Sequence, residues 1–288
     1  EVELAMVGRF SASRFWSEAQ AARASHIHYL GGVLQLLLKQ PPGRRDRAHG
    51  VRIAWGGGCP RPIWTPFEER FGVAIRECYG MTEASSITTY NDRGPVGSVG
   101  RAVPWFEVAI ADQRGHPLAP GAQGEIVVRQ RRPGALFAGY WDDPAASAAA
   151  LRDGALHTGD LGSIDAAGNL TFYGRITDSV RCGGENVSAW EVEHTAAGHP
   201  QVEACAMVGV PSELGEQDIK LFVKPRPGQS IEVAQLAAWL AERLAPYQTP
   251  RYIALVEAFA QTPSQRIMKH KLSRDTDCFD RRAARSAR

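Results

Sequence analysis

The sequence predicts an α/β layer with a mainly parallel sheet, followed by a β-rich subdomain and then a compact α+β domain. Three changes of pattern along the chain carry this prediction. Strand-like and helical runs alternate over residues 1–92, short strands separated by Gly, Asp and Asn turns fill 93–174, and a mixed pattern resumes over 175–273. The 288 residues are 44% hydrophobic and 22% charged, which is typical of globular chains that bury a sizeable core.

In the first region, apolar runs of strand length are separated by runs with helical periodicity. Helices are expected over 11–24, 30–39 and 65–71, and strands over 25–29, 51–55 and 73–78. Strands that alternate with helices indicate parallel pairing, because a parallel connection has to cross over the sheet. We therefore expect part of an α/β domain here.

In the second region, short strands are expected at 107–111, 125–129 and 170–173, with one helical insertion at 143–151. Pro144 occupies a favourable first-turn position of that helix. Short strands between turn residues are typical of antiparallel sheets, so this region predicts a small, barrel-like β unit.

The third region begins near Arg175 and has the pattern of an α+β domain. Ser188 and Glu191 form a capping-box pattern that predicts the start of a helix. Later strands are expected over 204–210, 219–223 and 252–256, and a helix over 231–244. The remaining tail, 274–288, ends in an Arg-rich run and is expected to be disordered.

Charge, hydropathy and cysteine content exclude several functional classes. The 33 basic and 31 acidic residues give a net charge of +2, which does not favour a nucleic-acid partner. The longest apolar stretch, 29–38, is far shorter than the ~20 residues of a membrane-spanning helix, so no membrane span is expected. The five cysteines are scattered without a C-x-x-C pair, which indicates free thiols in a reducing cytoplasm.

Two glycine-containing patches follow expected strands of the α/β layer. In Gly56-Gly-Gly58 the missing side chains would let a flat ligand approach the backbone, although a tight turn explains the same residues. Tyr79-Gly-Met-Thr-Glu83 offers an aromatic plate, a hydroxyl and a carboxylate, which suit a base, a phosphate oxygen and Mg²⁺. The alternative explanation of the second patch is the first turn of a helix.

Two further patches lie in or after the β-rich region. In His157-Thr-Gly-Asp-Leu161, the Asp160 carboxylate could accept two hydrogen bonds from a ribose diol, or it could cap a β-turn. The pair Gly174-Arg175 leads into Arg181-Cys-Gly-Gly-Glu-Asn186, where an Arg near a double glycine offers a cation for ribose or phosphate.

In this order and at these spacings, the patches resemble the adenylate-forming superfamily, which includes acyl-CoA synthetases, firefly luciferase and peptide-synthetase adenylation domains. The resemblance covers about residues 1–272 and implies the C-terminal part of the large adenylate-forming domain, followed by a mobile C-terminal domain. The run 183–188 and the segments 245–253 and 262–267 are most similar to the crotonobetaine/carnitine–CoA ligase branch. The matching motifs are Gly56-Gly-Gly-Cys-Pro60, Tyr79-Gly-Met-Thr-Glu83, Gly124-Glu125 with Gly139-Tyr-Trp141, Thr158-Gly-Asp160, and Gly174-Arg175 with Gly183-Gly-Glu-Asn186.

The resemblance implies how ATP would be held. Tyr79 should flank the adenine, Thr82 should contact the α-phosphate and Glu83 should hold Mg²⁺. Asp160 and Arg175 should bind the ribose hydroxyls. The implied nucleotide-binding residues are Gly56, Gly57, Gly58, Tyr79, Gly80, Asp160 and Arg175.

The resemblance also implies a CoA site, and it shows where this sequence departs from the family. Gly183 and Gly184 should line the tunnel for the pantetheine arm of CoA. The family's hinge residue is usually Asp or Lys and is Thr177 here, while the usual C-terminal Gly-Lys is Gln265-Arg266. The family's Ser/Thr/Gly-rich phosphate loop does not occur in the 288 residues and is expected upstream of Glu1.

The sequence therefore predicts an ATP-dependent acid–thiol ligase of the acyl-CoA synthetase type, with Thr82, Glu83 and Arg266 as catalytic residues. It would convert a carboxylic acid and ATP into acyl-AMP, and then acyl-AMP and CoA into acyl-CoA. An enzyme that loads a carrier protein and an inactive AMP-binding remnant are the alternatives. Without the phosphate loop, this portion is expected to bind AMP or acyl-AMP weakly and not to turn over ATP.

Overall fold

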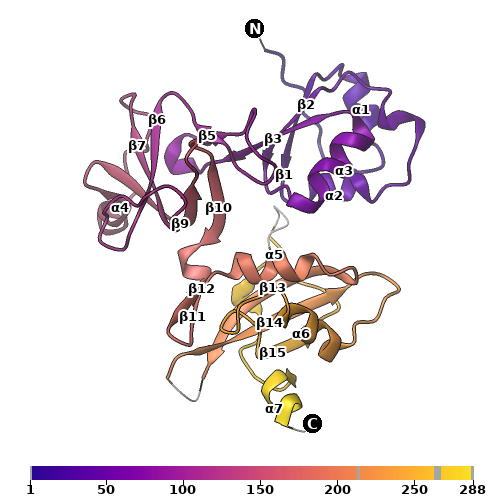
Figure 1. The fold of residues 1–288 in the computed structure, drawn as a ribbon. Helices are drawn as coiled ribbons and strands as arrows, with labels where there is room; N and C mark the ends of the chain where they lie inside the picture. The colour runs from indigo at the N-terminus through magenta and orange to yellow at the C-terminus, as the bar shows by residue number, and fades with distance from the viewer. Residues whose placement is uncertain (1, 213–214, 263–266, 287–288) are drawn as a thin grey trace. The chain divides into compact units, whose positions relative to one another are not determined.

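The computed structural model describes residues 2–212, 215–262 and 267–286 (Figure 1). The chain divides into two compact units, Glu1–Phe172 and Tyr173–Arg288. None of the helices in these described ranges is long and apolar enough to cross a membrane.

The first unit begins with the expected α/β layer. Its sheet has the order β1-β2-β3-β4-β5, in which β1 to β3 are parallel and β4 and β5 continue antiparallel. The strands are β1 (His26–Leu30), β2 (Ile53–Gly57), β3 (Ala74–Tyr79), β4 (Thr89–Tyr90) and β5 (Arg101–Ala102). The helices are α1 (Phe15–Ala21), α2 (Val33–Leu38) and α3 (Arg61–Phe71), with short 3₁₀ turns η1 (Arg44–Asp46) and η2 (Thr82–Ala84).

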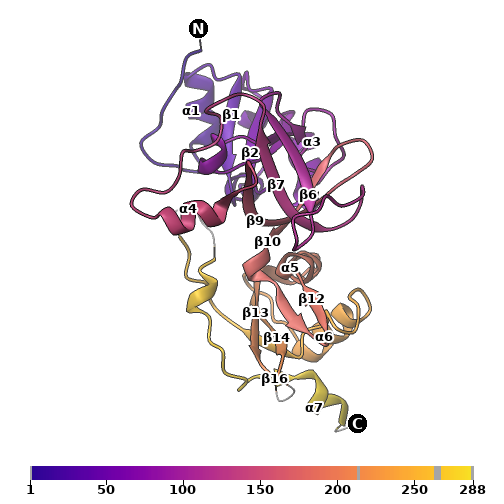
Figure 2. The same cartoon turned by 90° about the vertical axis from the view of Figure 1, so that its left-hand side faces the viewer.

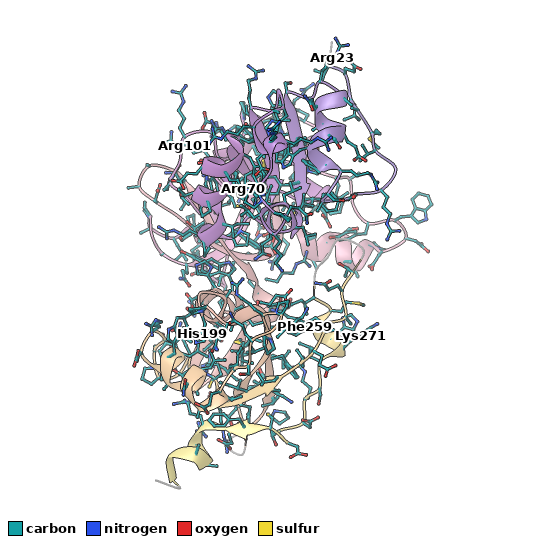
Figure 3. All side chains as sticks on the ribbon, turned by 90° about the vertical axis from the view of Figure 1, so that its right-hand side faces the viewer. Arg23, Arg70, Arg101, His199, Phe259 and Lys271 are labelled. Atoms are coloured by element: carbon teal, nitrogen blue, oxygen red, sulfur yellow. The ribbon has the colours of Figure 1, made fainter. Side chains whose placement is uncertain are left out.

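Apolar side chains from the helices and from one face of the sheet form the core of this layer. Leu34, Leu37 and Phe67 are completely buried there. Arg70, labelled in Figure 3, lies near the end of α3. It connects α3 to η1 and α2, because it pairs with Asp46 at 2.8 Å and donates to the Leu38 carbonyl at 2.7 Å. The helix expected over 11–24 is shorter, since Arg23 adopts a left-handed φ of 50° that ends it.

The β-rich region forms a second sheet with the order β10-β9-β7-β6, and β8 pairs with β9. Figure 2 shows β6 and β7 side by side, in agreement with their antiparallel register. The order ends at β10 and β6, and an antiparallel bridge joins Leu170 at the start of β10 to Gly100, next to β5. The elements are β6 (Phe106–Ala111), β7 (Gly124–Gln130), α4 (Pro144–Ala150), β8 (Leu151–Arg152), β9 (Ala155–Ile164) and β10 (Leu170–Arg175).

The second unit is an α+β domain built on the sheet β13-β14-β15-β16. Strands β14 and β15 are parallel, whereas the other two pairings are antiparallel. At the margin of its core, the rings of His199, labelled in Figure 3, and the partly buried Trp239 pack edge to face, with 5.1 Å between centroids. The elements are η3 (Ile176–Asp178), β11 (Val180–Cys182), β12 (Glu185–Val187), α5 (Ala189–Ala197), β13 (Val202–Pro211), β14 (Gln217–Pro225), α6 (Val233–Ala241), β15 (Tyr252–Leu255), η4 (Lys269–Lys271), β16 (Phe279–Asp280) and α7 (Arg281–Ser286).

The capping box expected at the start of α5 is wrong, although Ser188 is the N-cap residue. The buried Ser188 hydroxyl donates to the Tyr173 carbonyl at 2.8 Å and makes no capping bond. Glu191 instead accepts a hydrogen bond from Gln248 at 2.7 Å. Tertiary partners have therefore replaced the local partners that the spacing suggested.

The disordered tail expected from residue 274 onward is also wrong for the described part, because 279–286 form β16 and α7. Lys220 explains the order of this segment. Its side chain is only 2% exposed, and the ammonium group donates to the Asp275 carbonyl at 2.7 Å and to the Asp275 carboxylate at 3.1 Å. A buried ammonium group needs such acceptors. Arg251 adds a second tie, at 3.1 Å from Asp280.

Candidate functional site

The predicted glycine patch lies where three parallel strands of the first unit end. Gly56 is the partner of Tyr29 in β1, and a Cβ atom at Gly56 would lie 1.9 Å from the Tyr29 carbonyl oxygen. Gly58 has a φ of +96°, a conformation that side-chain-bearing residues rarely adopt. Only glycine fits these two positions, so the patch leaves bare backbone at this edge of the sheet.

A carboxylate that the sequence analysis missed fixes this glycine turn. Glu77 in β3 is 5% exposed and accepts hydrogen bonds from the backbone N–H groups of Gly58 at 2.6 Å and Cys59 at 3.0 Å. The Tyr29 hydroxyl also donates to it. Burial raises the pKa of the Glu77 carboxyl to about 7, against the lowering effect of these donors. A charged residue in an otherwise buried strand was the available sequence signal.

Tyr79 and Asp160, predicted from separate motifs, are in direct contact. The Tyr79 hydroxyl donates to Asp160 Oδ2 at 2.7 Å, and the Tyr79 ring packs against Phe172 with 5.5 Å between centroids. Tyr79 ends β3 in the first sheet, whereas Asp160 lies in β9 of the second sheet. The structure thus brings together a predicted adenine-flanking residue and a predicted ribose-binding residue.

Glu125 positions the turn that precedes Asp160. One of its carboxylate oxygens accepts the Gly159 N–H at 3.0 Å, and the other lies 2.8 Å from His157 Nδ1. Gly159 has a left-handed φ of +68°. The resemblance to the adenylate-forming superfamily implies no role for the motif Gly124-Glu125. These contacts show that Glu125 holds the Gly159 turn in place.

Thr82 and Glu83 lie in the short turn η2, directly after the Tyr79-Gly80 pair. The loop folds back tightly, since a Cβ atom at Gly80 would lie 1.8 Å from the Ser86 carbonyl oxygen. The Thr82 side chain is exposed, and the Glu83 carboxylate accepts a hydrogen bond from the Tyr140 hydroxyl at 2.9 Å. Tyr140 belongs to the matched motif Gly139-Tyr-Trp141, and its hydroxyl restrains Glu83, the predicted Mg²⁺ ligand.

Glu83 could ligate Mg²⁺ only if a bound nucleotide supplied further oxygen ligands. Within the described part of the chain, no group of three or more His, Cys, Asp or Glu side chains could hold a metal ion. Glu83 offers one half-exposed carboxylate, and Mg²⁺ in nucleotide sites commonly takes one or two carboxylates together with phosphate oxygens and water. The residues present therefore fit an ion that arrives with a nucleotide.

The remaining predicted residues lie in the second unit. Arg175, at the end of β10, and Thr177, in η3, are both exposed. Gly183 and Gly184 form the tip of the β11–β12 hairpin with φ values of +62° and +81°. The Gly184 N–H donates to Glu216 at 2.9 Å. The ribose role of Arg175, the hinge role of Thr177 and the CoA role of the two glycines stay predictions.

Arg266 and its neighbour Gln265 lie outside the described residues. The nearest described cation in sequence, Lys269, is held by two carboxylates of the second unit. Its ammonium group lies 2.8 Å from Glu193 and 3.5 Å from Asp178. Burial raises the pKa of Glu193, and the ammonium group of Lys269 opposes that shift.

Comparison with known proteins identifies the family to which this arrangement belongs. The family model for AMP-binding enzymes matches residues 3–141, and the model for the C-terminal domain of AMP-binding enzymes matches residues 191–266. The chain belongs to the AMP-binding enzyme family. The first match contains the glycine patch, Tyr79, Glu83 and Tyr140, while Asp160 and Arg175 lie between the two matched segments.

Individual relatives within the AMP-binding family agree with this assignment. The chain is 34% identical over 264 residues to a feruloyl-CoA synthase of an Amycolatopsis species, covering 90% of this chain and 53% of that protein. It is 31% identical over 273 residues to a crotonobetaine/carnitine–CoA ligase of Escherichia coli, covering 93% and 53%. The amide bond synthetase McbA of Marinactinospora thermotolerans superposes with a TM-score of 0.83 at 29% identity, covering 92% and 55%. The chain thus spans about half the length of the relatives it matches.

Proposed function

We propose that this chain carries the nucleotide-binding and acyl-transfer parts of an ATP-dependent acid–thiol ligase. The observation that carries the proposal is the Tyr79–Asp160 hydrogen bond of 2.7 Å. It joins two residues that were assigned to the adenine and to the ribose from separate motifs, in a chain of the AMP-binding family.

In the proposed first step, an oxygen of the substrate carboxylate attacks the α-phosphorus of ATP. The bond between the α-phosphorus and the bridging oxygen breaks, and pyrophosphate leaves from the resulting acyl-AMP. The bare backbone at Gly56–Gly58 admits the nucleotide, while Asp160 accepts hydrogen bonds from the ribose hydroxyls. Catalysis then depends on positioning and on electrostatic stabilisation of the charge that spreads over the phosphate oxygens.

Three residues of the chain act on that charge in the proposal. The exposed Thr82 hydroxyl donates to an α-phosphate oxygen, and Arg266 supplies a cation. Glu83, restrained by the Tyr140 hydroxyl at 2.9 Å, would hold Mg²⁺. When bound, Mg²⁺ supplies positive charge beside the phosphates.

In the proposed second step, the thiol of CoA attacks the acyl carbonyl carbon and AMP leaves. The hairpin tip at Gly183 and Gly184 has no side chains to block a narrow pantetheine arm. Thr177, in the short turn η3, is the proposed hinge for the change between the two steps. CoA is the proposed acceptor because the two curated relatives named above are CoA ligases.

The similarity to an amide bond synthetase supports a second candidate, in which an amine accepts the acyl group. An assay that supplies acyl-AMP with CoA, with an amine or with a carrier protein separates the acceptors. Thioester formation with free CoA supports the first proposal, whereas amide formation or a requirement for carrier protein replaces it.

The nucleotide part of the proposal is tested on the chain itself by calorimetric titration with AMP. AMP binding that is weakened by Asp160→Ala and unaffected by Asp92→Ala, an exposed control, supports the proposed site. Equal affinities in all three proteins, or no binding of AMP by the unchanged chain, would refute it.

A further inference from the structure

Three residues from consecutive parallel strands lie side by side beneath the glycine turn. Tyr29 in β1 pairs in register with Gly56 in β2, and Gly56 pairs in register with Glu77 in β3. All three are buried and belong to the same face of the sheet, since buried positions alternate along each strand. Because Gly56 has no side chain, the Tyr29 phenol can reach across β2 to the Glu77 carboxylate.

Each of the hydrogen-bonding partners identified for Glu77 is a donor. The Tyr29 hydroxyl donates to Oε2, the Gly58 N–H donates to Oε1 at 2.6 Å, and the Cys59 N–H donates to Oε1 at 3.0 Å and to Oε2 at 3.3 Å. An ionised carboxylate accepts from all of them, whereas a protonated one has to direct its own O–H towards an acceptor. Hydrogen bonds from N–H groups to a charged oxygen are also about twice as strong as neutral ones.

The titratable groups that interact electrostatically with Glu77 are the Tyr29 phenol and the Cys59 and Cys78 thiols, and all three are neutral near pH 7. Burial raises the pKa of the Tyr29 phenol and of the Cys59 thiol, and it raises the pKa of the Cys78 thiol to about 11. From α3, the Glu68 carboxylate acts electrostatically on Cys59 and accepts the Ile75 N–H at 2.8 Å. Glu77 is therefore the group in this cluster whose charge changes near neutral pH.

We propose that Glu77 is a positioning residue, whose ionised carboxylate fixes the Gly58–Cys59 turn in the form that receives the nucleotide. The inference rests on the proposed function, which assigns that turn to the nucleotide. Glu77 itself is buried beneath the turn and need not touch the nucleotide. The order of the turn thus depends on the charge of a side chain from the neighbouring strand.

The sign of the pH dependence follows from the raised pKa. As the pH falls through about 7, the Glu77 carboxyl takes up a proton and the two backbone N–H groups lose a charged acceptor. AMP affinity should therefore rise with pH over this range. Folding stability should move in the opposite direction, because the pKa is about 7 in the folded chain and ordinarily about 4.5 when unfolded. The neutral Glu77 acid stabilises the folded chain fully at pH values below about 4.5, the pKa of the unfolded chain, and this stabilisation is lost as the pH rises towards 7.

Two substitutions test the proposal on the whole chain, with a third as control. Glu77→Gln keeps the shape and one carbonyl acceptor but removes the charge, and Glu77→Met keeps the bulk but removes both acceptors. Glu69→Gln alters an exposed carboxylate on α3 and serves as the matched control. The measurements are amide hydrogen exchange at Gly58 and Cys59 without ligand, and the AMP dissociation constant from about pH 6 to about pH 8.5.

In the unchanged chain and in Glu69→Gln, AMP affinity should increase by about tenfold over this pH range, the effect expected from strengthening two hydrogen bonds. In Glu77→Gln the part of this increase that comes from Glu77 should disappear, which leaves only the change that ionisation of the AMP phosphate brings equally to every variant. In Glu77→Met, exchange at Gly58 and Cys59 should accelerate at least tenfold. Glu77→Gln also covers the case in which Glu77→Met does not fold.

Two results overturn the proposal: Glu77→Gln retains the whole pH dependence of AMP affinity that the unchanged chain shows, or exchange at Gly58 and Cys59 changes less than twofold in both Glu77 variants. Failure of the proposed function has a different signature. If no protein binds AMP at any pH, the nucleotide site is refuted and the proposal, which rests on it, falls as well. The exchange data then report only whether Glu77 orders the turn.

Discussion

Replacement of Tyr79 by Phe removes one hydroxyl group from a buried contact within the first unit. That hydroxyl lies 2.7 Å from Asp160 Oδ2, and the two residues are only 7% and 4% exposed. A hydrogen bond to a charged group contributes about 1.5–3 kcal/mol when water cannot replace the lost partner. We therefore expect Tyr79→Phe to lower the free energy of unfolding by about 2 kcal/mol, measured by chemical denaturation.

A double-mutant cycle with Asp160→Ala isolates the pair and separates stability from binding. Both single variants lose the same hydrogen bond. The sum of their losses in unfolding free energy should therefore exceed the loss in the double variant by at least about 1 kcal/mol. Asp160→Ala should also weaken AMP binding by about 2–3 kcal/mol, because charge-assisted bonds to the ribose disappear. Strictly additive unfolding energies would refute the structural reasoning, and a change in AMP affinity below about threefold would return Asp160 to a turn-capping role.

Other contacts give further expectations. Glu125→Gln, which weakens the support of Gly159 at 3.0 Å, should reduce AMP affinity by about threefold to tenfold in calorimetry, and unchanged affinity would contradict a positioning role. Lys269→Met leaves Glu193 without the cation at 2.8 Å and should cost about 2–3 kcal/mol in denaturant unfolding at about pH 8. The loss of stability caused by Lys269→Met should be smaller at about pH 5. Burial raises the pKa of Glu193, and once Glu193 is protonated it needs no cation. An equal loss at both pH values would contradict this role of Lys269. In the full-length enzyme, which would include the phosphate loop expected upstream of Glu1, Arg266→Ala should slow acyl-AMP formation by at least ~100-fold, about 2.7 kcal/mol. Thioester formation from supplied acyl-AMP should stay within severalfold, and equal loss in both half-reactions would indicate a structural role.

The sequence was sufficient for the parts of the fold that depend on local pattern. The parallel order of β1 to β3 follows from alternating strands and helices, and the glycine patch falls at the end of β2 as its position after an apolar strand predicted. The helix α4 begins at Pro144, and the Asp143 side chain caps it by accepting the Ala146 N–H at 2.9 Å. Each of these features is encoded within a few neighbouring residues.

Features that depend on register between distant segments were not accessible from the sequence. The role of Glu77 requires knowing that positions 29, 56 and 77 are neighbours across three strands. The role of Tyr140 likewise requires the long-range contact with Glu83. The capping box at Ser188 failed for the same reason, since the Ser188 hydroxyl donates to the distant Tyr173 carbonyl and does not accept the local backbone N–H of Glu191.

The order of the C-terminal segment has a consequence for synthesis of the protein. A ribosome releases β13, β14 and β15 before it releases Asp275 and the strand β16 that completes the sheet. During that interval Lys220 lacks the acceptors that surround its ammonium group in the finished unit, and burying it would be costly. The nascent second unit should therefore stay open to chaperones and proteases until its final strand emerges.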